Sequence, residues 1–148
     1  MTDMLVKLYN LKNYEVQEAA LNEEGIKIRR AIPPEKQKVL NWIENNFYTE
    51  WRSEADVAFG KSPAGIFIAY KEKTILGFAC YDTTAKGFFG PTGVNEDARG
   101  KGIGTVLLLK SLDALKELGY VYAIIGDVGP IDYYKNVCDA QVIKGSED

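Results

Sequence analysis

The chain has 148 residues, a length usual for one folded domain, and 46% of them are hydrophobic and 26% charged, as in soluble globular proteins. Its net charge of −3 provides no basic surface for a nucleic-acid backbone or an anionic membrane, so both partners are excluded. The absence of histidine excludes Ser-His-Asp and Cys-His nucleophile systems and histidine-ligated metals, and two cysteines are too few for a disulfide framework or a zinc cluster.

The N-terminal part of the chain predicts two short strands joined by a helix. Apolar and polar residues alternate over residues 5–9, which indicates a strand. Asn13 is expected to cap a helix that ends near Gly25. Residues 26–31 alternate again with period two and predict the second strand.

Two helices are predicted after this strand. Pro33 and Pro34 suit a first helical turn, because proline there lacks only an N–H group that the helix leaves unpaired anyway. Apolar residues then recur on one side of the expected helix, opposite charged and amide side chains. These apolar residues are Val39, Leu40, Trp42, Ile43 and Phe47. Thr49 is expected to cap a second helix over residues 50–59.

The middle of the chain predicts an antiparallel meander. Residues 65–70 and 74–81 are β-rich runs separated by a connection of hairpin length, and residues 86–94 are expected to add a third strand. Gly90, Pro91 and Gly93 interrupt this third run. They indicate a bulge, or the close approach of another backbone or of a ligand.

A long helix and a strand-helix-strand unit are predicted for the C-terminal part. Residues 103–118 form the longest helical pattern, and Gly119 follows where a C′ glycine is expected. Its apolar stripe consists of Ile103, Leu107, Leu108, Leu112 and Leu115. Residues 120–125 read as a buried strand, residues 130–137 as a short helix and residues 140–143 as a final strand. The element order predicts an α/β (α+β) domain, a mixed sheet with helices packed on it.

The segment between the third meander strand and the long helix indicates an anion site. It consists of Arg99, Gly100, Lys101, Gly102, Ile103, Gly104 and Thr105. Its glycines allow backbone N–H groups to approach a bulky anion at a helix N-terminus, which carries about half a positive charge, and the two cations suit a diphosphate. No P-loop string is present, and Thr105 stands where the dinucleotide fingerprint needs glycine, so ATP and NAD are disfavoured.

The pattern Arg-x-x-Gly-x-Gly in residues 99–104 resembles the coenzyme A loop of the GNAT superfamily of N-acetyltransferases. The resemblance covers residues 26–143 and includes Gly93-Val94, the helix after the loop, and Tyr133-Tyr134-Lys135 followed by a last strand. It implies a single domain with a mixed, mainly antiparallel sheet, helices on both faces and a splayed central strand pair. It also implies an acetyltransferase domain over residues 26–148, with residues 1–25 as a strand-helix extension packed on it.

The resemblance implies acetyl-CoA as the co-substrate and no metal. Carried over by position, Thr92, Gly93 and Val94 are expected to contact the pantetheine arm and the acetyl group in the gap between the splayed strands. Residues 99–105 are expected to hold the pyrophosphate. A backbone N–H near Val94 is expected to polarise the thioester carbonyl and to stabilise the developing oxyanion.

Tyr134 is the residue that the resemblance implies as the proton or hydrogen-bond donor to the leaving thiolate. A phenol titrates near pH ~10 and a thiol near ~8.5, so this interaction is energetically modest. One alternative is Tyr133, because adjacent helical residues point about 100° apart and only one can face the sulfur. The other is that Tyr134 only packs, as tyrosines on short amphipathic helices often do. The family often follows this tyrosine with Gly-Phe, whereas residues 138–140 here are Cys-Asp-Ala, so the register stays open.

The group that removes the proton of the acceptor amine is also left open. Asp82 at the end of a meander strand, Glu54 on the second helix and Asp127 before the last helix are candidates, or else solvated surface acids. A water chain is an alternative to all three. Trp51 and Tyr81 are candidates for the wall of an acceptor pocket, or else core residues.

The acceptor is predicted from a narrower likeness. Residues 89–94 and 122–126 are similar to a bacterial GNAT subgroup associated with amino sugars, so we favour acetyl transfer to a small primary amine such as glucosamine. A polyamine, an aminoglycoside, an amino acid or a protein N-terminus is the alternative acceptor. Two other classes are a non-catalytic coenzyme A sensor and an interaction domain without a cofactor.

The sequence also predicts where the protein is found. Because it shows neither an apolar segment of about 18 residues nor a secretory signal, we expect a cytoplasmic protein. An exposed edge strand near the C-terminus would suit a homodimer.

Overall fold

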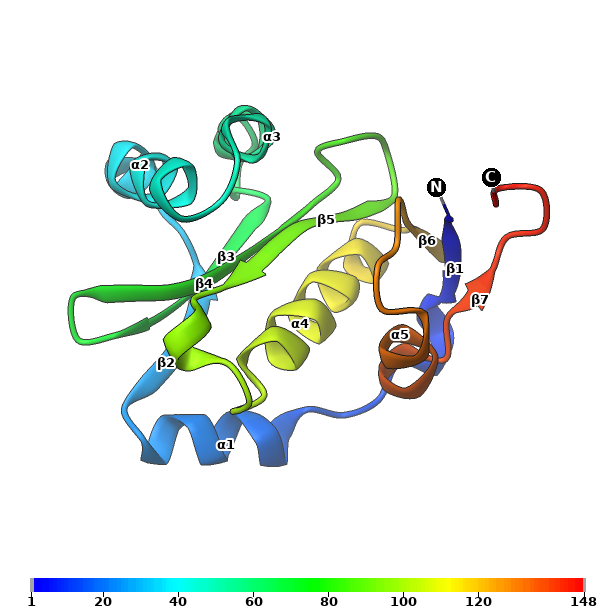
Figure 1. Cartoon of the computed structure of the whole chain (residues 1–148), viewed down its shortest axis with the longest axis horizontal. Helices are drawn as coiled ribbons and strands as arrows, with labels where there is room; N and C mark the ends of the chain where they lie inside the picture. The colour runs from blue at the N-terminus through cyan, green and yellow to red at the C-terminus, as the bar shows by residue number, and fades with distance from the viewer. Residues whose placement is uncertain (1, 148) are drawn as a thin grey trace.

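The computed structural model describes residues 2–147, and a seven-stranded sheet forms its centre (Figure 1). The strands follow the order β2-β3-β4-β5-β6-β1-β7 across the sheet. They are β1 (Met4–Lys7), β2 (Ile26–Arg30), β3 (Ile66–Lys71), β4 (Thr74–Tyr81), β5 (Phe88–Val94), β6 (Tyr122–Ile125) and β7 (Gln141–Val142). Among the described strands, β5 and β6 alone pair in parallel, so the sheet is mixed and mainly antiparallel, as predicted.

Helices cover both faces of the sheet. They are α1 (Glu15–Glu23), α2 (Lys36–Asn46), α3 (Thr49–Phe59), α4 (Ile103–Glu117) and α5 (Ile131–Cys138), with short 3-10 turns η1 (Leu8–Asn10), η2 (Pro33–Glu35) and η3 (Glu96–Ala98). In Figure 1, α2 and α3 lie on one side, while α1 and α4 lie on the other, with α5 beside α4. Among the described residues, no helix has the length and apolarity needed to cross a bilayer.

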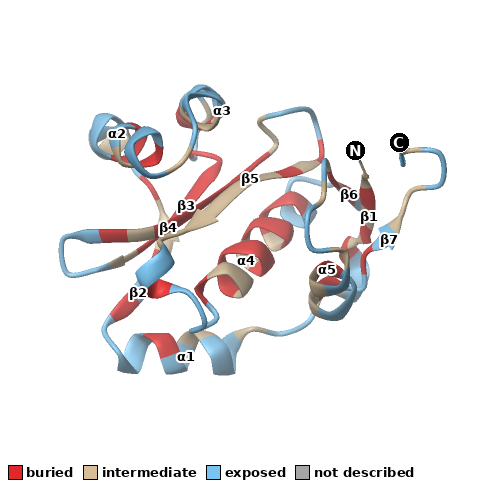
Figure 2. Cartoon of the chain, viewed as in Figure 1, coloured by how far each residue is buried: buried red, intermediate tan, exposed pale blue. Residues whose placement is uncertain are grey.

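Two hydrophobic cores correspond to these two faces. One core joins α2 and α3 to residues such as Ile68 and Phe78, and the other joins α4 and α1 to residues such as Ala79 and Tyr81. Because successive strand residues point to opposite faces, Phe78 and Ala79 of β4 belong to different cores. Figure 2 shows many buried residues along α4, and every residue of the predicted apolar stripe is buried.

The parallel pair β5 and β6 separates soon after it begins. Their register contains only the pairs Phe88↔Ile124 and Phe89↔Ile125. Beyond Phe89, β5 stays paired with β4 up to Val94 and leaves its other edge free. The splayed strand pair implied by the resemblance is therefore present, at the position of the irregular Gly-Pro-Thr-Gly sequence.

The N-terminal strand differs most from the sequence prediction. It covers Met4–Lys7, and the expected last residues of the strand form η1 instead. β1 lies between β6 and β7, antiparallel to both, so residues from the two ends of the chain meet in the same part of the sheet (Figure 1). β7 forms one edge of the sheet and has two residues, fewer than expected.

Other boundaries differ by one or two residues. Tyr48 occupies the cap position of α3, where its carbonyl accepts hydrogen bonds from the N–H groups of Trp51 and Arg52, so Thr49 is the first helical residue rather than the cap. Tyr14, not the expected Asn13, occupies the cap position of α1, although the Asn13 side chain accepts a hydrogen bond of 2.7 Å from the N–H of Glu15, the first helical residue. Cys80 and Cys138 are free and buried, one in each core.

Candidate active site

A cleft opens where β5 leaves β6, and α4 begins at its mouth. Its volume is about 560 Å³. The lining consists of Phe89, Thr92, Gly93, Val94, Ala98, Arg99, Gly100, Gly102, Ile103, Gly104, Thr105, Leu108, Pro130, Tyr133 and Tyr134. The structure therefore brings together the three strand residues and six of the seven loop residues that the sequence assigned to the co-substrate. We call this space the donor cleft.

The N-terminus of α4 presents free N–H groups to the donor cleft. Gly102 precedes the helix in the left-handed conformation, with φ of 89° and ψ of 9°, which glycine adopts without strain. The first helical hydrogen bond runs from the N–H of Val106 to the carbonyl of Gly102 at 3.2 Å, and no side chain caps the helix. The N–H groups at positions 103–105 therefore have no partner within the helix and are oriented for an anion.

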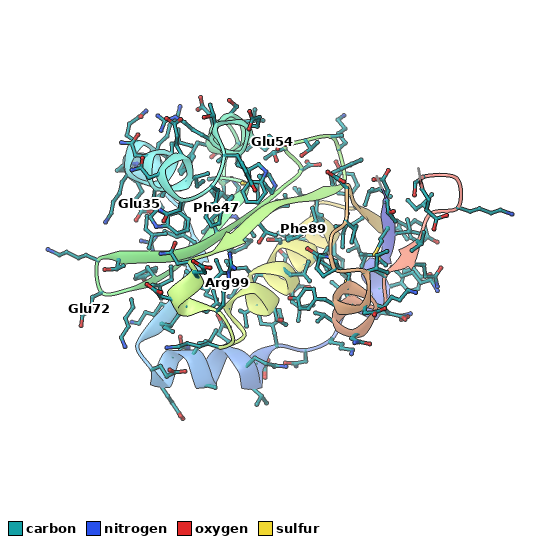
Figure 3. All side chains as sticks on the ribbon, in the orientation of Figure 1. Glu35, Phe47, Glu54, Glu72, Phe89 and Arg99 are labelled. Atoms are coloured by element: carbon teal, nitrogen blue, oxygen red, sulfur yellow. The ribbon has the colours of Figure 1, made fainter. Side chains whose placement is uncertain are left out.

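The two cations of the loop have different surroundings. Arg99 lies where η3 leads from β5 to α4 (Figure 3), and its Nε donates a hydrogen bond of 3.2 Å to the carbonyl of Val94. This bond holds the guanidinium at the cleft mouth. Lys101 instead places its Nζ 3.4 Å from a carboxylate oxygen of Glu24, and it is not part of the cleft wall. Arg99 is thus the cation best placed for a pyrophosphate.

The free edge of β5 supplies backbone groups to the donor cleft. The N–H of Asn95 bonds to the carbonyl of Leu76 on β4 at 2.8 Å. Because hydrogen-bonding directions alternate along an antiparallel strand, the N–H groups of Val94 and Thr92 point away from β4, toward the gap. Gly93 lies between them against the ring of Phe47, where an added Cβ would lie 2.6 Å from Cζ. Glycine is therefore needed for this close approach.

Tyr133 and Tyr134 have separate roles in the walls. The hydroxyl groups of Tyr133 and Thr105 share a hydrogen bond of 2.8 Å at the start of α4. Tyr134 is only 9% exposed, and burial, followed by the nearby Tyr133 and Cys138, raises the pKa of its phenol to about 12. Burial also raises the pKa of Tyr133. Both phenols therefore stay protonated at neutral pH.

A second cavity of about 510 Å³ adjoins the donor cleft. Its lining consists of Asp3, Trp51, Glu54, Thr84, Phe88, Phe89, Gly90, Pro91, Thr92, Ile125, Gly126, Asp127, Val128, Gly129 and Tyr134. Phe89, Thr92 and Tyr134 belong to the walls of both spaces. Figure 3 shows Glu54 on α3 and Phe89 on β5, which contribute to this cavity from different layers. We call it the acceptor cavity.

The architecture and the loop correspond to a known family. The model of the acetyltransferase (GNAT) family matches residues 36–136, which is more than half of the chain. The chain belongs to the GNAT family.

Solved GNAT structures share this fold. A GCN5-related glucosamine N-acetyltransferase region of a fungal multi-domain GH3 beta-N-acetylglucosaminidase has a TM-score of 0.77 at 17% identity, covering 96% of this chain and 19% of that one. A GCN5-related N-acetyltransferase from Sphaerobacter thermophilus has a TM-score of 0.73 at 21% identity, covering 96% and 48%. A GNAT acetyltransferase from Brucella melitensis in complex with acetyl-CoA has a TM-score of 0.53 at 20% identity, covering 83% and 90%. No curated protein sequence matches at a significant level.

The lengths of these GNAT proteins differ from that of the chain. The chain spans 19% of the fungal protein and 48% of the Sphaerobacter protein.

The acceptor-side candidates divide into two groups. Trp51, Glu54 and Asp127 line the acceptor cavity, whereas Tyr81 and Asp82 do not. The Tyr81 hydroxyl accepts hydrogen bonds from the Arg30 guanidinium at 3.1 and 2.6 Å, and its ring lies in the core. Tyr81 therefore has a packing role in this GNAT domain.

Asp82 fastens the loop between β4 and β5. Its carboxylate accepts hydrogen bonds from the N–H of Gly87 at 2.7 Å and from the hydroxyl of Tyr120 at 2.8 Å, and it pairs with Lys61 at 3.3 Å. Burial alone would raise the pKa of Asp82, but the Gly87 amide, the Tyr120 hydroxyl and the Lys61 ammonium together lower it. A carboxylate with these partners is poorly suited to accept a proton from an amine.

Replacing Asp82 with asparagine is expected to lower stability by about 1–3 kcal/mol at pH 7, because three donors lose a charged acceptor. Since the folded-state pKa is lowered, this stabilisation is present above the unfolded pKa and is lost as pH falls through the folded one. Urea unfolding at pH 7 and pH 3 should show a difference between wild type and variant that shrinks at low pH. The exposed pair of Asp56 with Lys36 provides a control, and Asp56→Asn should change little. An equal loss from Asp82→Asn at both pH values would contradict this role.

Some lining residues were missed by the sequence reasoning. Asp3 precedes β1 and reaches the acceptor cavity because β1 pairs with β6, where its carboxylate accepts a hydrogen bond of 3.0 Å from the N–H of Asp127. Thr84 reaches it from the loop that Asp82 fastens, and its hydroxyl bonds to Glu54. No motif in the sequence marks either residue. Among residues 2–147, no three cysteine or carboxylate side chains gather as metal ligands.

Proposed function

We propose that the chain transfers an acetyl group from acetyl-CoA directly to the primary amine of a small molecule bound in the acceptor cavity. The observation that carries this proposal is that the donor cleft and the acceptor cavity share Phe89, Thr92 and Tyr134 as walls. A thioester in one space and an amine in the other would therefore meet at these residues, as group transfer without a covalent enzyme intermediate requires.

The residues present fit acetyl-CoA. The free N–H groups at the start of α4 and the Arg99 guanidinium would hold its pyrophosphate, and the unpaired edge of β5 would bond to the pantetheine arm. When bound, acetyl-CoA supplies an activated acetyl group. The N–H of Val94 would donate to the thioester carbonyl oxygen, where negative charge develops during attack.

Tyr134 would donate a hydrogen bond to the leaving sulfur. Its phenol is held neutral by burial, and it lies on the boundary between the two spaces. Transfer of its proton to a thiolate is uphill, because a thiol titrates near ~8.5. A hydrogen bond, or proton transfer late in the step, is therefore the role that we assign to it.

The acceptor amine must lose a proton to attack. Glu54 and Asp127 line the acceptor cavity and could accept this proton directly or through water. We propose an amino sugar such as glucosamine as the first acceptor to test, because the similar fungal region is described as a glucosamine N-acetyltransferase. The Trp51 indole, which also lines the cavity, offers an apolar face suited to a sugar ring.

Free-thiol release tests this function with a panel of amines. The panel contains glucosamine, a polyamine, an aminoglycoside, an amino acid and a peptide with a free N-terminus. We expect release that depends on glucosamine, with an acetylated sugar identified by mass. If acetyl-CoA binds but no amine supports thiol release, the proposed acetyl transfer is wrong and the protein is a non-catalytic coenzyme A sensor.

A further inference from the structure

The charged side chains that the structure shows in the walls of the acceptor cavity are all acidic. Among the residues that the structure describes, Asp3, Glu54 and Asp127 are part of its lining, and no lysine or arginine is. From this we infer that the acceptor cavity selects amines that carry no phosphate or carboxylate group. The inference rests on the proposed function and narrows its acceptor to a cationic amine without an anionic substituent.

The three carboxylates lie on two sides of the cavity. Glu54 belongs to α3, which covers one face of the sheet. Asp3 and Asp127 lie next to β1 and β6, in the sheet beyond β5. An acceptor placed between α3 and the sheet would therefore meet a carboxylate on either side.

Among residues 2–147, the hydrogen bonds of these carboxylates come from uncharged groups. The Glu54 carboxylate bonds to the Thr84 hydroxyl, and the Asp3 carboxylate bonds to the N–H of Asp127. Within the part of the chain that the structure describes, neither these two nor Asp127 pairs with a lysine or an arginine. Asp82 differs, because Lys61 pairs with it and it lies outside the cavity wall.

The charges act on an acceptor at short range. At about 6 Å and an effective dielectric constant of about 40, one like charge lowers affinity roughly tenfold, and one opposite charge raises it by the same factor. Two or three carboxylates together therefore favour a cationic acceptor over its anionic analogue by roughly a hundredfold or more.

The donor cleft has the opposite polarity. Arg99 and the N-terminus of α4 are positive, and no carboxylate from residues 2–147 lines the cleft. The sign of the charge thus changes across the shared wall at Tyr134. Phosphates are drawn to the donor cleft, and ammonium groups are drawn to the acceptor cavity. An acceptor with its own phosphate would place that phosphate on the unfavourable side.

The inference is tested with two pairs of acceptors that differ in one anionic group, glucosamine with glucosamine 6-phosphate and glycinamide with glycine. We expect kcat/KM to favour the member without the anion by roughly a hundredfold in each pair. Glu54→Gln and Asp127→Asn should each lower this preference about tenfold. A loss of general-base activity slows both members of a pair alike, so the ratio isolates charge selection.

Glu50→Gln is the matched control, because Glu50 lies one turn earlier on α3, is exposed and does not line the cavity. It should leave the preference unchanged. Equal kcat/KM within each pair, or the same change in all three variants, overturns the inference.

A binding readout separates this inference from the proposed function. Thermal stabilisation is measured with coenzyme A present and each acceptor added. If no amine is acetylated but the acceptors without an anionic group still stabilise the protein more strongly, the proposed acetyl transfer is wrong and the inference of charge selection is supported. If the anionic members stabilise it equally, charge selection is wrong whatever the turnover.

Discussion

Replacing Tyr134 with phenylalanine is expected to lower kcat by a factor of about 10² or more, which is the usual contribution of a positioned proton or hydrogen-bond donor. The dissociation constant of acetyl-CoA should change little, because the ring that forms the shared wall remains. The pKa of about 12 keeps the phenol protonated across the range in which the enzyme can be assayed, so its ionisation should not shape the pH profile below that value. The decrease should accordingly be the same at pH 7 and pH 9.

Tyr133→Phe is the control for this experiment. Its hydroxyl bonds to Thr105 at the start of α4, and Tyr133 lines the donor cleft but not the acceptor cavity. We expect this variant to weaken acetyl-CoA binding and to retain most of kcat. Steady-state thiol release gives kcat, and titration gives the dissociation constant. If Tyr133→Phe loses turnover and Tyr134→Phe does not, the donor role belongs to Tyr133.

The sequence predicted those parts of the fold that depend on local patterns. The apolar stripe of α4 recurs over four turns, and the hairpin of β3 and β4 combines two β-rich runs with a short connection. The place of β1 between β6 and β7 could not be predicted, because it depends on contacts between residues more than a hundred positions apart. A strand of four residues also carries too little alternation to fix where it ends.

In the candidate site, too, local sequence patterns could be interpreted, whereas contacts between distant residues could not. The donor loop could be predicted because its glycines, its cation and the helix N-terminus are adjacent in the sequence. The acceptor side could not, because Asp82, Glu54 and Asp127 look alike as isolated carboxylates. Only the folded chain shows that the Gly87 amide, Tyr120 and Lys61 engage Asp82, whereas the other two face a cavity.

Replacing Gly102 with valine is expected to abolish measurable acetyl-CoA binding while the protein remains folded. Position 102 has a positive φ, which a β-branched residue adopts only with strain of about 1–2 kcal/mol or more. Relief of this strain would rotate the first turn of α4 and redirect the N–H groups at positions 103–105. The valine side chain would also stand at the cleft mouth, where an anion must approach the backbone.

Gly119→Val separates this effect from a general loss of stability. Gly119 follows the other end of α4, also has a positive φ, and, as at Gly102, an added Cβ there would meet no atom within 4 Å. Both variants should therefore unfold at a lower temperature than wild type.

A hundredfold excess of acetyl-CoA over its dissociation constant stabilises a binding-competent protein by about 2.7 kcal/mol, which raises Tm by roughly 5–10 °C in a domain of this size. Gly119→Val should keep this rise and Gly102→Val should lose it, because only the N-terminal end of α4 offers free N–H groups to the donor cleft. A normal rise in Gly102→Val would mean that the pyrophosphate is held elsewhere.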